Sequence, residues 1–267
     1  MKKQFGFSIL ELMVVTAIIA ILVSIFLPKL QSERQTVSPT KIEKIKQTGY
    51  GTRGTDMSWP SMPSGSVAQA DNLLAKNYMF VLDASGSMSD ASCTKLSSKM
   101  DEARSAIMAF GESLDADSNI GLLTFSGKRI STVLPLSMYD QQRLKTALST
   151  VYPSGSTPLA DAMDVGFKAL NDQAIKQLGN GQYNLVVVTD GQADKGQNVL
   201  GTVRQVVNTS PVMIHAVGFC IGNNHALNQQ GLTRYVAASD GAALRKGLHA
   251  VLAEAPSFDA SAFKAVQ

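Results

Sequence analysis

Hydrophobic positions near the N-terminus form one long run. From Phe7 to Leu27 the sequence reads FSILELMVVTAIIAILVSIFL and carries a single charge, at Glu11. At about 1.5 Å per residue, a helix of this length spans about 30 Å, which is the hydrocarbon thickness of a bilayer. Lys2 and Lys3 precede the run, and positive residues favour the cytoplasmic side. The pattern predicts a single membrane-spanning helix with a cytoplasmic N-terminus.

Beyond about residue 72, short apolar runs alternate with amphipathic stretches. The runs predict strands over Tyr78–Leu82, Ile120–Phe125, Ile130–Val133, Leu185–Thr189 and Val212–Phe219. The amphipathic stretches predict helices over Lys95–Leu114, Gln141–Thr150, Pro158–Gln177, Gln197–Val207, Leu227–Ala238 and Ala242–Glu254. Strands rich in Val, Leu and Ile that alternate with such helices are typical of a mainly parallel sheet covered on both faces. We therefore expect an α/β, Rossmann-like fold for residues 72–255.

The remaining segments are expected to connect or flank these two parts. Residues 7–48 are expected to form the apolar helix and its polar extension. Residues 49–71 are expected to form a linker, because Gly, Ser and Pro are dense there and apolar periodicity is absent. Residues 49–54 satisfy G-x-G-x-x-G, but a dinucleotide-binding loop needs a strand before it and a helix after it. Trp59 is expected to pack the linker onto the globular domain, with contact to a partner as the alternative. Residues 256–267 are expected to be a C-terminal tail.

Composition and charge exclude several classes of protein. Hydrophobic residues make up 45% and charged residues 17%, which excludes an intrinsically disordered chain. The net charge of +3, from 24 Lys and Arg against 21 Asp and Glu, is too small for nucleic acid to be the expected partner. Two cysteines exclude a cysteine-rich zinc module. Cys93 and Cys220 both follow predicted strands at one edge of the sheet. We therefore expect a disulfide between them in an oxidising compartment, with two separate buried thiols as the alternative.

The N-terminal run also carries a specific order of residues. A short basic leader precedes Gly6 and Phe7, and Glu11 is the fifth residue of the apolar helix. This order, KKQFG|FSILELMVVTAIIAIL, resembles the N-terminus of type IV pilins and of the pseudopilins of type II secretion. The resemblance implies that a prepilin peptidase removes residues 1–6 by cutting between Gly6 and Phe7, and that it methylates Phe7. It also implies that Glu11 pairs with the N-terminal amine of a neighbouring subunit during filament assembly. A carboxylate in a bilayer needs such a partner, and snorkelling to the interface is the alternative.

Oxygen-bearing side chains gather directly after the predicted strands. Asp83, Ser85 and Ser87 follow the first strand, Asp190 follows the strand that ends in VVVT, and Thr157 lies in a loop that enters a helix. In such sheets, ligands bind beyond the carboxyl ends of the strands, where the topology switches direction. Two carboxylates and three hydroxyls are hard donors that suit Mg²⁺ or Mn²⁺ and would hold zinc or copper poorly.

The same pattern resembles a known binding site. D-x-S-x-S after the first strand, a later Thr and a later T-D-G are similar to the metal-ion-dependent adhesion site of von Willebrand factor A domains, and the resemblance spans residues 76–254. It implies that one divalent ion is held by Asp83, Ser85, Ser87, Thr157 and Asp190. It also implies that a Glu or Asp carboxylate of a protein ligand completes the coordination, so the domain would bind and not catalyse. A domain that kept the fold and lost the metal is the alternative.

The sequence lacks the common signatures of enzymes, which also favours a binding domain. DASGS is not the G-x-S-x-G of hydrolases, no G-x-x-x-x-G-K-[ST] phosphate loop occurs, and the three histidines lack H-E-x-x-H spacing. Only His225 is expected on the rim near Ser85 and Ser87, whereas His215 is expected in the core or at a strand end. Asp194 is expected to be a solvated loop residue or, as the alternative, to tune the rim of the metal site.

These expectations together describe a minor pilin that displays an adhesive domain. We expect a single pass through the bacterial inner membrane with the globular domain in the periplasm, and a place in a pilus or at the cell surface after assembly. The expected partners are prepilin peptidase, other pilin or pseudopilin subunits, and a protein ligand with an acidic side chain. Two alternatives stay open: a subunit that primes pilus or pseudopilus assembly by docking another subunit, and a membrane-anchored regulator of secretion.

Overall fold

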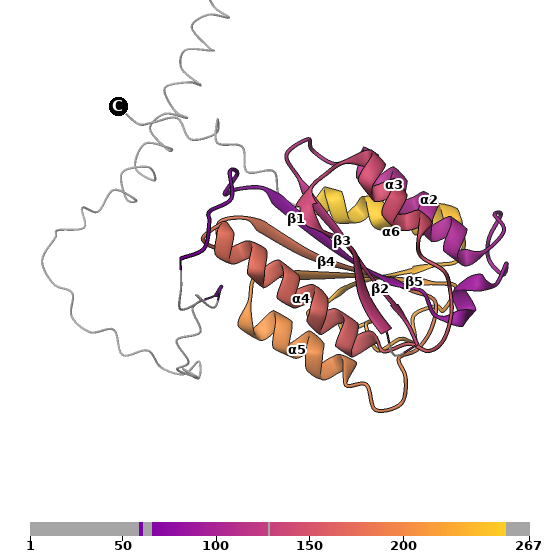
Figure 1. The fold of residues 1–267 in the computed structure, drawn as a ribbon. Coiled ribbons are helices and arrows are strands. Elements are labelled where there is room, and N and C mark those ends of the chain that lie inside the picture. The colour runs from indigo at the N-terminus through magenta and orange to yellow at the C-terminus, as the bar shows by residue number, and fades with distance from the viewer. Residues whose placement is uncertain (1–58, 61–65, 128, 255–267) are drawn as a thin grey trace, which may run out of the picture. The chain divides into compact units, whose positions relative to one another are not determined.

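The computed structural model describes residues 59–60, 66–127 and 129–254 (Figure 1). Within these ranges, no helix has both the length and the apolar character needed to cross a membrane. The predicted span over residues 7–27 lies outside them, as do the predicted cleavage position between Gly6 and Phe7 and the carboxylate of Glu11.

Strands and helices are interspersed along the described chain, with β2 directly followed by β3, α3 by α4 and β5 by β6. The strands are β1 (Lys76–Asp83), β2 (Asn119–Ser126), β3 (Arg129–Met138), β4 (Gln182–Thr189), β5 (Met213–Phe219) and β6 (Arg234–Ala238). The helices are η1 (Gly86–Ser89, a 3₁₀ turn), α2 (Lys99–Glu112), α3 (Gln141–Ser149), α4 (Leu159–Lys176), α5 (Val199–Thr209) and α6 (Gly241–Glu254). The strand order is β3-β2-β1-β4-β5-β6, and every neighbouring pair is parallel except β2 and β3.

The central strand β1 is buried on both faces, and its side chains alternate between two cores. Tyr78, Phe80 and Leu82 point into the core that includes residues of α2, α3 and α6. Met79 and Val81 point into the core that includes residues of α4 and α5. This alternation follows from the period of two along a strand. Figure 1 shows the two groups of helices on opposite faces of the sheet. The prediction of a mainly parallel α/β sheet covered on both faces is therefore confirmed.

One predicted helix is wrong. The pattern over Leu227–Ala238 predicted a helix, but the structure has turns before residue 234 and strand β6 after it. Gly231 has a φ of +79°, a left-handed conformation that interrupts helical geometry. From Arg234 onward the backbone pairs in parallel with β5. A short apolar run fits the helical and the strand period alike, so the neighbouring strand decided the outcome.

Two other helices begin later than the pattern predicts, and a side-chain cap marks each true start. Helix α2 begins at Lys99, because the side chain of Ser98 accepts a hydrogen bond from the backbone N–H of Asp101. Helix α5 begins at Val199, because the side chain of Asn198 caps it in the same way. The loop before α2 is therefore longer than predicted, which leaves room for the segment that contains Cys93.

Trp59 packs onto the globular domain, as predicted. Its ring meets that of Tyr183 edge to face, with centroids 4.8 Å apart and planes inclined by 75°. It also lies against the core that includes α4 and α5. The fluorescence of Trp59, the single tryptophan of the sequence, should therefore change when the domain unfolds.

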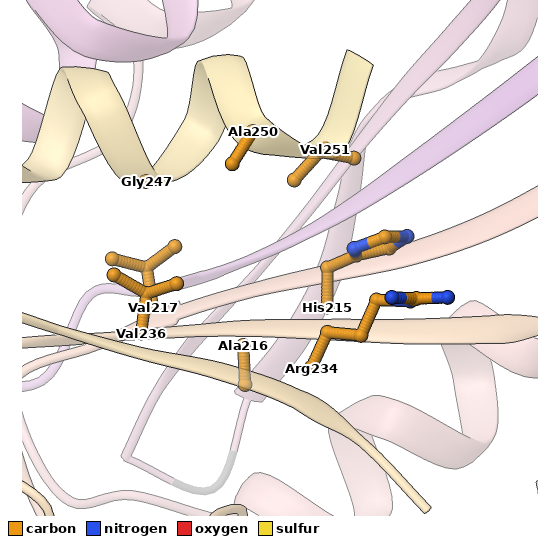
Figure 2. A pocket seen from close by; sticks show the side chains of 8 residues that line it. All are labelled: His215, Ala216, Val217, Arg234, Val236, Gly247, Ala250 and Val251. Atoms are coloured by element: carbon orange, nitrogen blue, oxygen red, sulfur yellow. The ribbon is translucent and has the colours of Figure 1, made fainter. Parts of the chain in front are cut away.

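A hollow of about 20 Å³ lies between α6 and strands β5 and β6 (Figure 2). Such a volume holds about one water molecule, so the hollow is a packing gap and not a ligand site. His215 and Arg234 lie side by side at one end of it (Figure 2). His215 is 3% exposed, and its Nε2 lies 3.2 Å from Oδ1 of Asn184. His215 is therefore a core residue, as predicted. Its burial lowers its pKa to about 4, and the nearby positive charge of Arg234 makes a smaller contribution in the same direction.

Candidate metal centre

The candidate site lies where β1 and β4 end side by side. The two strands are parallel neighbours, and Leu82 of β1 stands opposite Val188 of β4. The chain leaves β1 for β2 on one side and leaves β4 for β5 on the other side. This edge is therefore the topological switch point, where an α/β sheet forms its binding crevice.

Asp83, the last residue of β1, is fully buried at this edge. Its Oδ1 accepts a 2.7 Å hydrogen bond from the backbone N–H of Ser85, and its Oδ2 accepts a 2.6 Å bond from the hydroxyl of Thr189. Burial raises the pKa of the Asp83 carboxyl. Hydrogen bonds from Ser85 and Thr189 oppose this rise, the negative charge of Asp190 adds to it, and the net shift is upward. A cation beside the two carboxylates would offset their repulsion.

Ser85, Ser87 and Asp190 form a connected chain of side-chain oxygens. The hydroxyl of Ser87 donates a 2.7 Å hydrogen bond to Oδ1 of Asp190, and the hydroxyls of Ser85 and Ser87 lie 3.1 Å apart. Ser85 itself is extended, but Gly86–Ser89 forms a 3₁₀ turn and not the extended loop that alternation would give. The turn still brings Ser87 next to Asp190.

The loop that carries Thr157 lies against the Asp83–Ser87 loop. The backbone N–H of Ser154 donates to the carbonyl of Ala84 at 2.8 Å, and that of Gly86 donates to the carbonyl of Gly155 at 3.1 Å. Gly155 has a φ of +72°, and a Cβ at this position would lie 2.5 Å from the backbone of Gly127. Only glycine allows this approach, so Gly155 is needed for the loop to take this path.

Asp194 holds Thr157 in place through two hydrogen bonds of 3.0 Å. Its Oδ1 accepts from the backbone N–H of Thr157, and its own N–H donates to the carbonyl of Thr157. Thr157 is 8% exposed. Of the two interpretations of Asp194 from sequence, the structure therefore favours a role at the rim of the site, where it positions a predicted ligand.

The five predicted residues suit a hard divalent cation. They offer two carboxylates and three hydroxyls from three loops at one edge of the sheet, and all but Ser87 are buried. The described part of the chain contains no cluster of three or more His, Cys, Asp or Glu residues suited to a metal. The candidate shell differs from such clusters because hydroxyls make up most of it, and hydroxyls bind Mg²⁺ or Mn²⁺ better than they bind zinc.

A buried ammonium group that no sequence pattern predicts also lies at the site. Nζ of Lys99, at the start of α2, lies 2.8 Å from Oδ2 of Asp190. Only 8% of the Lys99 side chain and none of the Asp190 side chain is exposed. Burial lowers the pKa of Lys99, but its hydrogen bond and charge interaction with Asp190 outweigh burial and leave the pKa above its usual value. Lys99 therefore stays charged.

His225 lies at the rim, as predicted, but it contacts the backbone and not the serines. Its Nδ1 accepts a 3.1 Å hydrogen bond from the N–H of Leu227, so in the neutral ring the hydrogen is on Nε2. Nε2 lies 2.8 Å from the carbonyl oxygen of Gly191, to which it donates. Burial lowers the pKa of His225 and the bond to Gly191 partly opposes this, which favours the neutral ring. His225 thus fixes the turn that follows Asp190.

Cys93 and Cys220 lie at the same edge of the sheet, as the strand order predicts. Both are free thiols, and Sγ of Cys220 lies 3.9 Å from the carbonyl oxygen of Ser92, the residue before Cys93. Burial raises the pKa of Cys220 to about 12, and contact with the Cys93 thiol makes a smaller contribution in the same direction. The two thiols are close together, and the disulfide between them stays a prediction.

The fold and the site together define a class of protein. A mainly parallel six-stranded sheet with helices on both faces, D-x-S-x-S at the end of β1 and T-D-G at the end of β4 are the features of a von Willebrand factor A domain. Family models agree. Residues 78–192 match the model described as von Willebrand factor type A domain, and residues 1–27 match the model described as prokaryotic N-terminal methylation motif. The chain therefore combines a pilin-type methylation motif with a von Willebrand factor A domain, as the two resemblances implied.

Solved structures share the fold of the domain at low sequence identity. A von Willebrand factor type A protein from Catenulispora acidiphila is 15% identical with a TM-score of 0.55, over 67% of this chain and 42% of that chain. The PilB minor pilin from Streptococcus sanguinis is 17% identical with a TM-score of 0.52, over 68% of this chain and 61% of that chain. The pilus adhesin SpaC from Lactobacillus rhamnosus GG is 15% identical with a TM-score of 0.52, over 70% of this chain and 31% of that chain. At these identities the likeness shows the fold alone.

A sequence relative extends over much of the same region. The uncharacterized protein YwmC of Bacillus subtilis (strain 168) is 26% identical over 156 residues, which are 54% of this chain and 66% of that protein. The chain thus spans just under two thirds of the length of this relative.

Proposed function

We propose that this chain is a minor pilin-like subunit that displays a von Willebrand factor A domain for metal-dependent binding of an acidic protein ligand. The observation that carries the proposal is the connected cluster of Asp83, Ser85, Ser87 and Asp190 at the switch point of the sheet. The loop that carries Thr157 lies against this cluster. The methylation motif at residues 1–27 supports the pilin part of the proposal.

The side chains at the site would hold one Mg²⁺ or Mn²⁺ ion. Such an ion, when bound, supplies an electrophilic centre for a carboxylate of another protein. Three of the five protein donors are neutral hydroxyls and only two are carboxylates. The shell therefore carries no excess of negative charge over the ion, which stays attractive to a further carboxylate. Thr189 and Asp194 support this function indirectly, because they orient Asp83 and Thr157 respectively.

The N-terminal motif supports a route to the cell surface. A prepilin peptidase would cut after Gly6, and the new N-terminus at Phe7 would be methylated. The apolar helix would hold the chain in the inner membrane, with the domain in the periplasm, until the helix enters a pilus or pseudopilus beside other subunits. Glu11 would then pair with the terminal amine of a neighbour. Two proteins that share the domain fold, PilB and SpaC, are described as a minor pilin and a pilus adhesin.

Metal-dependent recognition of carboxylates is the direct test. The full-length chain in detergent is mixed with carboxylate-coated beads in millimolar Mg²⁺, and hydroxyl-coated beads serve as the control. We expect retention on the carboxylate beads only, and its loss on chelation. Retention that is equal on both surfaces, or that is unaffected by chelator, contradicts the proposal.

The location is tested on cells. Sheared filaments are labelled with an antibody against the domain, and adhesion is compared with that of a strain whose chain lacks residues 72–255. We expect label on the filaments, and loss of adhesion without loss of filaments. A chain that is found only in the membrane contradicts the pilus location and favours a regulator of secretion.

A further inference from the structure

Asp190 uses both of its carboxylate oxygens inside the domain. Oδ1 accepts from the hydroxyl of Ser87 at 2.7 Å, and Oδ2 accepts from the ammonium of Lys99 at 2.8 Å. The Lys99–Asp190 pair is shielded from solvent, whereas the pair between Lys168 and Asp172 is 74% and 53% exposed. Salt and solvent screen a buried pair less than a surface pair, so the charge of Lys99 acts on the site more strongly than an exposed lysine would.

Lys99 occupies a position that is unfavourable for a cation. It is the first residue of α2, where the helix dipole is positive and acidic residues are preferred. The nearby carboxylates of Asp101 and Glu102 are engaged elsewhere, by Arg104 and Arg245 respectively. Lysine is also among the residues that are least often buried. The attraction of Asp190 is the main interaction that offsets these costs, and the nearby negative charge of Asp90 adds to it.

We infer that Lys99 is an internal cation that competes with the divalent ion for Asp190, and that it thereby weakens metal binding and lets the domain fold without metal. The inference rests on the metal site of the proposed function. Its physical basis is the charge of the site. Asp83 and Asp190 are two buried carboxylates, and Lys99 neutralises one of them before any ion arrives. An incoming ion meets a positive charge already bound to Asp190, and like charges repel.

Removing the ammonium of Lys99 should therefore make the stability of the domain depend on the divalent ion. Without Lys99, two buried carboxylates lack a cation, so the metal-free domain is destabilised. The same change leaves Asp190 free to act on the ion, so metal binding becomes tighter. Because a ligand that binds only the folded state stabilises it, the melting temperature of such a variant should rise strongly with Mg²⁺.

The test uses the full-length chain in detergent, with Lys99→Met, Lys99→Gln and the surface control Lys168→Met. Mg²⁺ affinity is measured by calorimetry, and the melting temperature is followed by the fluorescence of Trp59 with and without millimolar Mg²⁺. The Gln variant is neutral but can still donate a hydrogen bond to Asp190, so it covers the case in which the Met variant does not fold. We expect both Lys99 variants to bind Mg²⁺ at least about tenfold more tightly than the wild type does. We also expect Mg²⁺ to raise the melting temperature of these variants more than it raises that of the wild type. The Lys168 variant should match the wild type.

The outcomes separate this inference from the proposed function. If Lys99 variants and wild type bind Mg²⁺ equally, the competition is refuted and the metal site stands. If the Lys99 variants fail to fold with Mg²⁺ present, the ion cannot replace the ammonium and the inference is also refuted. If only the Lys99 variants bind Mg²⁺, the inference is supported and the metal-dependent function of the native chain fails. If none binds the ion, both fail.

Discussion

The hydroxyl of Ser87 donates a 2.7 Å hydrogen bond to Oδ1 of Asp190, which lies 103 positions further along the chain. This bond joins the loop after β1 to the turn after β4, and it connects the two halves of the predicted metal shell. Because both loops begin at the ends of buried strands, the sheet itself sets their separation. A change at either end should therefore affect metal binding more than the fold.

The first prediction concerns the buried carboxylate of Asp83. Asp83→Asn keeps the shape of the side chain and removes its charge, so it should lower Mg²⁺ affinity at least about tenfold. The metal-free melting temperature should not fall, because burial already disfavours the charged form and raises the pKa of Asp83. Calorimetry and thermal unfolding measure the two effects. Asp172→Asn, on the exposed surface of α4, is the control and should change neither. Unchanged Mg²⁺ affinity in Asp83→Asn would show that this carboxylate is not part of the shell.

The second prediction is that Thr157 contributes less to Mg²⁺ affinity than Asp83 does. Thr157→Ala removes one neutral oxygen and should weaken Mg²⁺ binding less than Asp83→Asn does. Thr157→Ser keeps the hydroxyl, and the backbone bonds to Asp194 do not depend on the side chain, so this variant should bind almost as the wild type does. Equal losses in the Ala and Ser variants would show that the hydroxyl is not a ligand.

The third prediction concerns the stability of the fold at low pH. His215 has a pKa of about 4 in the folded domain and 6.5 as the ordinary value. The unfolded chain therefore binds a proton below about pH 6.5 that the folded chain does not bind until about pH 4. This contribution of His215 should lower the free energy of unfolding by roughly 3 kcal/mol as pH falls through that window.

Urea unfolding at a series of pH values measures this effect. His215→Gln keeps a donor for Asn184 and should flatten the profile between pH 6.5 and 4. His249→Gln is the matched control, since His249 is exposed on α6. A profile that is identical in wild type and His215→Gln would show that the buried ring does not control acid sensitivity.

The fourth prediction is the disulfide between Cys93 and Cys220. In an oxidising compartment, the two thiols would reduce the disulfide of a thiol oxidoreductase, lose two protons and two electrons, and form one S–S bond. The contact of Cys220 with the carbonyl of Ser92 supports this pairing. Chain isolated from the periplasm and unfolded should show no free thiol, and reduction should lower its stability by about 2–4 kcal/mol. Two alkylatable thiols in that sample would contradict the prediction.

The fifth prediction is N-terminal processing. The intact mass should show loss of residues 1–6 and gain of one methyl group, and the loss of Lys2 and Lys3 should change the net charge from +3 to +1. Glu11→Ala should be cleaved normally but assemble poorly, because only the pairing with a neighbouring subunit is lost. Glu33→Ala, in the polar extension, is the control for assembly. A mature chain that still begins at Met1 would contradict the pilin interpretation.

The sequence alone determined the fold class and named most residues of the candidate site, because both depend on local patterns. A buried parallel strand is a short apolar run, and the candidate ligands stand directly after such runs, as Asp83 does after β1 and Asp190 after β4. The glycine of SGST likewise marks a loop that only glycine can form. Strand β6 was predicted as a helix because its few apolar positions fit both periods, and only pairing with β5 distinguishes them.

Only the tertiary structure decided which distant groups act on the site. The pairing of Lys99 with Asp190 spans 91 positions, that of Asp194 with Thr157 spans 37, and that of His225 with Gly191 spans 34. No periodicity in the chain encodes these contacts. They depend on where each loop lies once the sheet has formed, and their energies depend on burial that exists only in the folded domain. The same lysine would be an ordinary solvated charge in the unfolded chain, and at the end of the sheet it becomes a counter-ion of the candidate metal site.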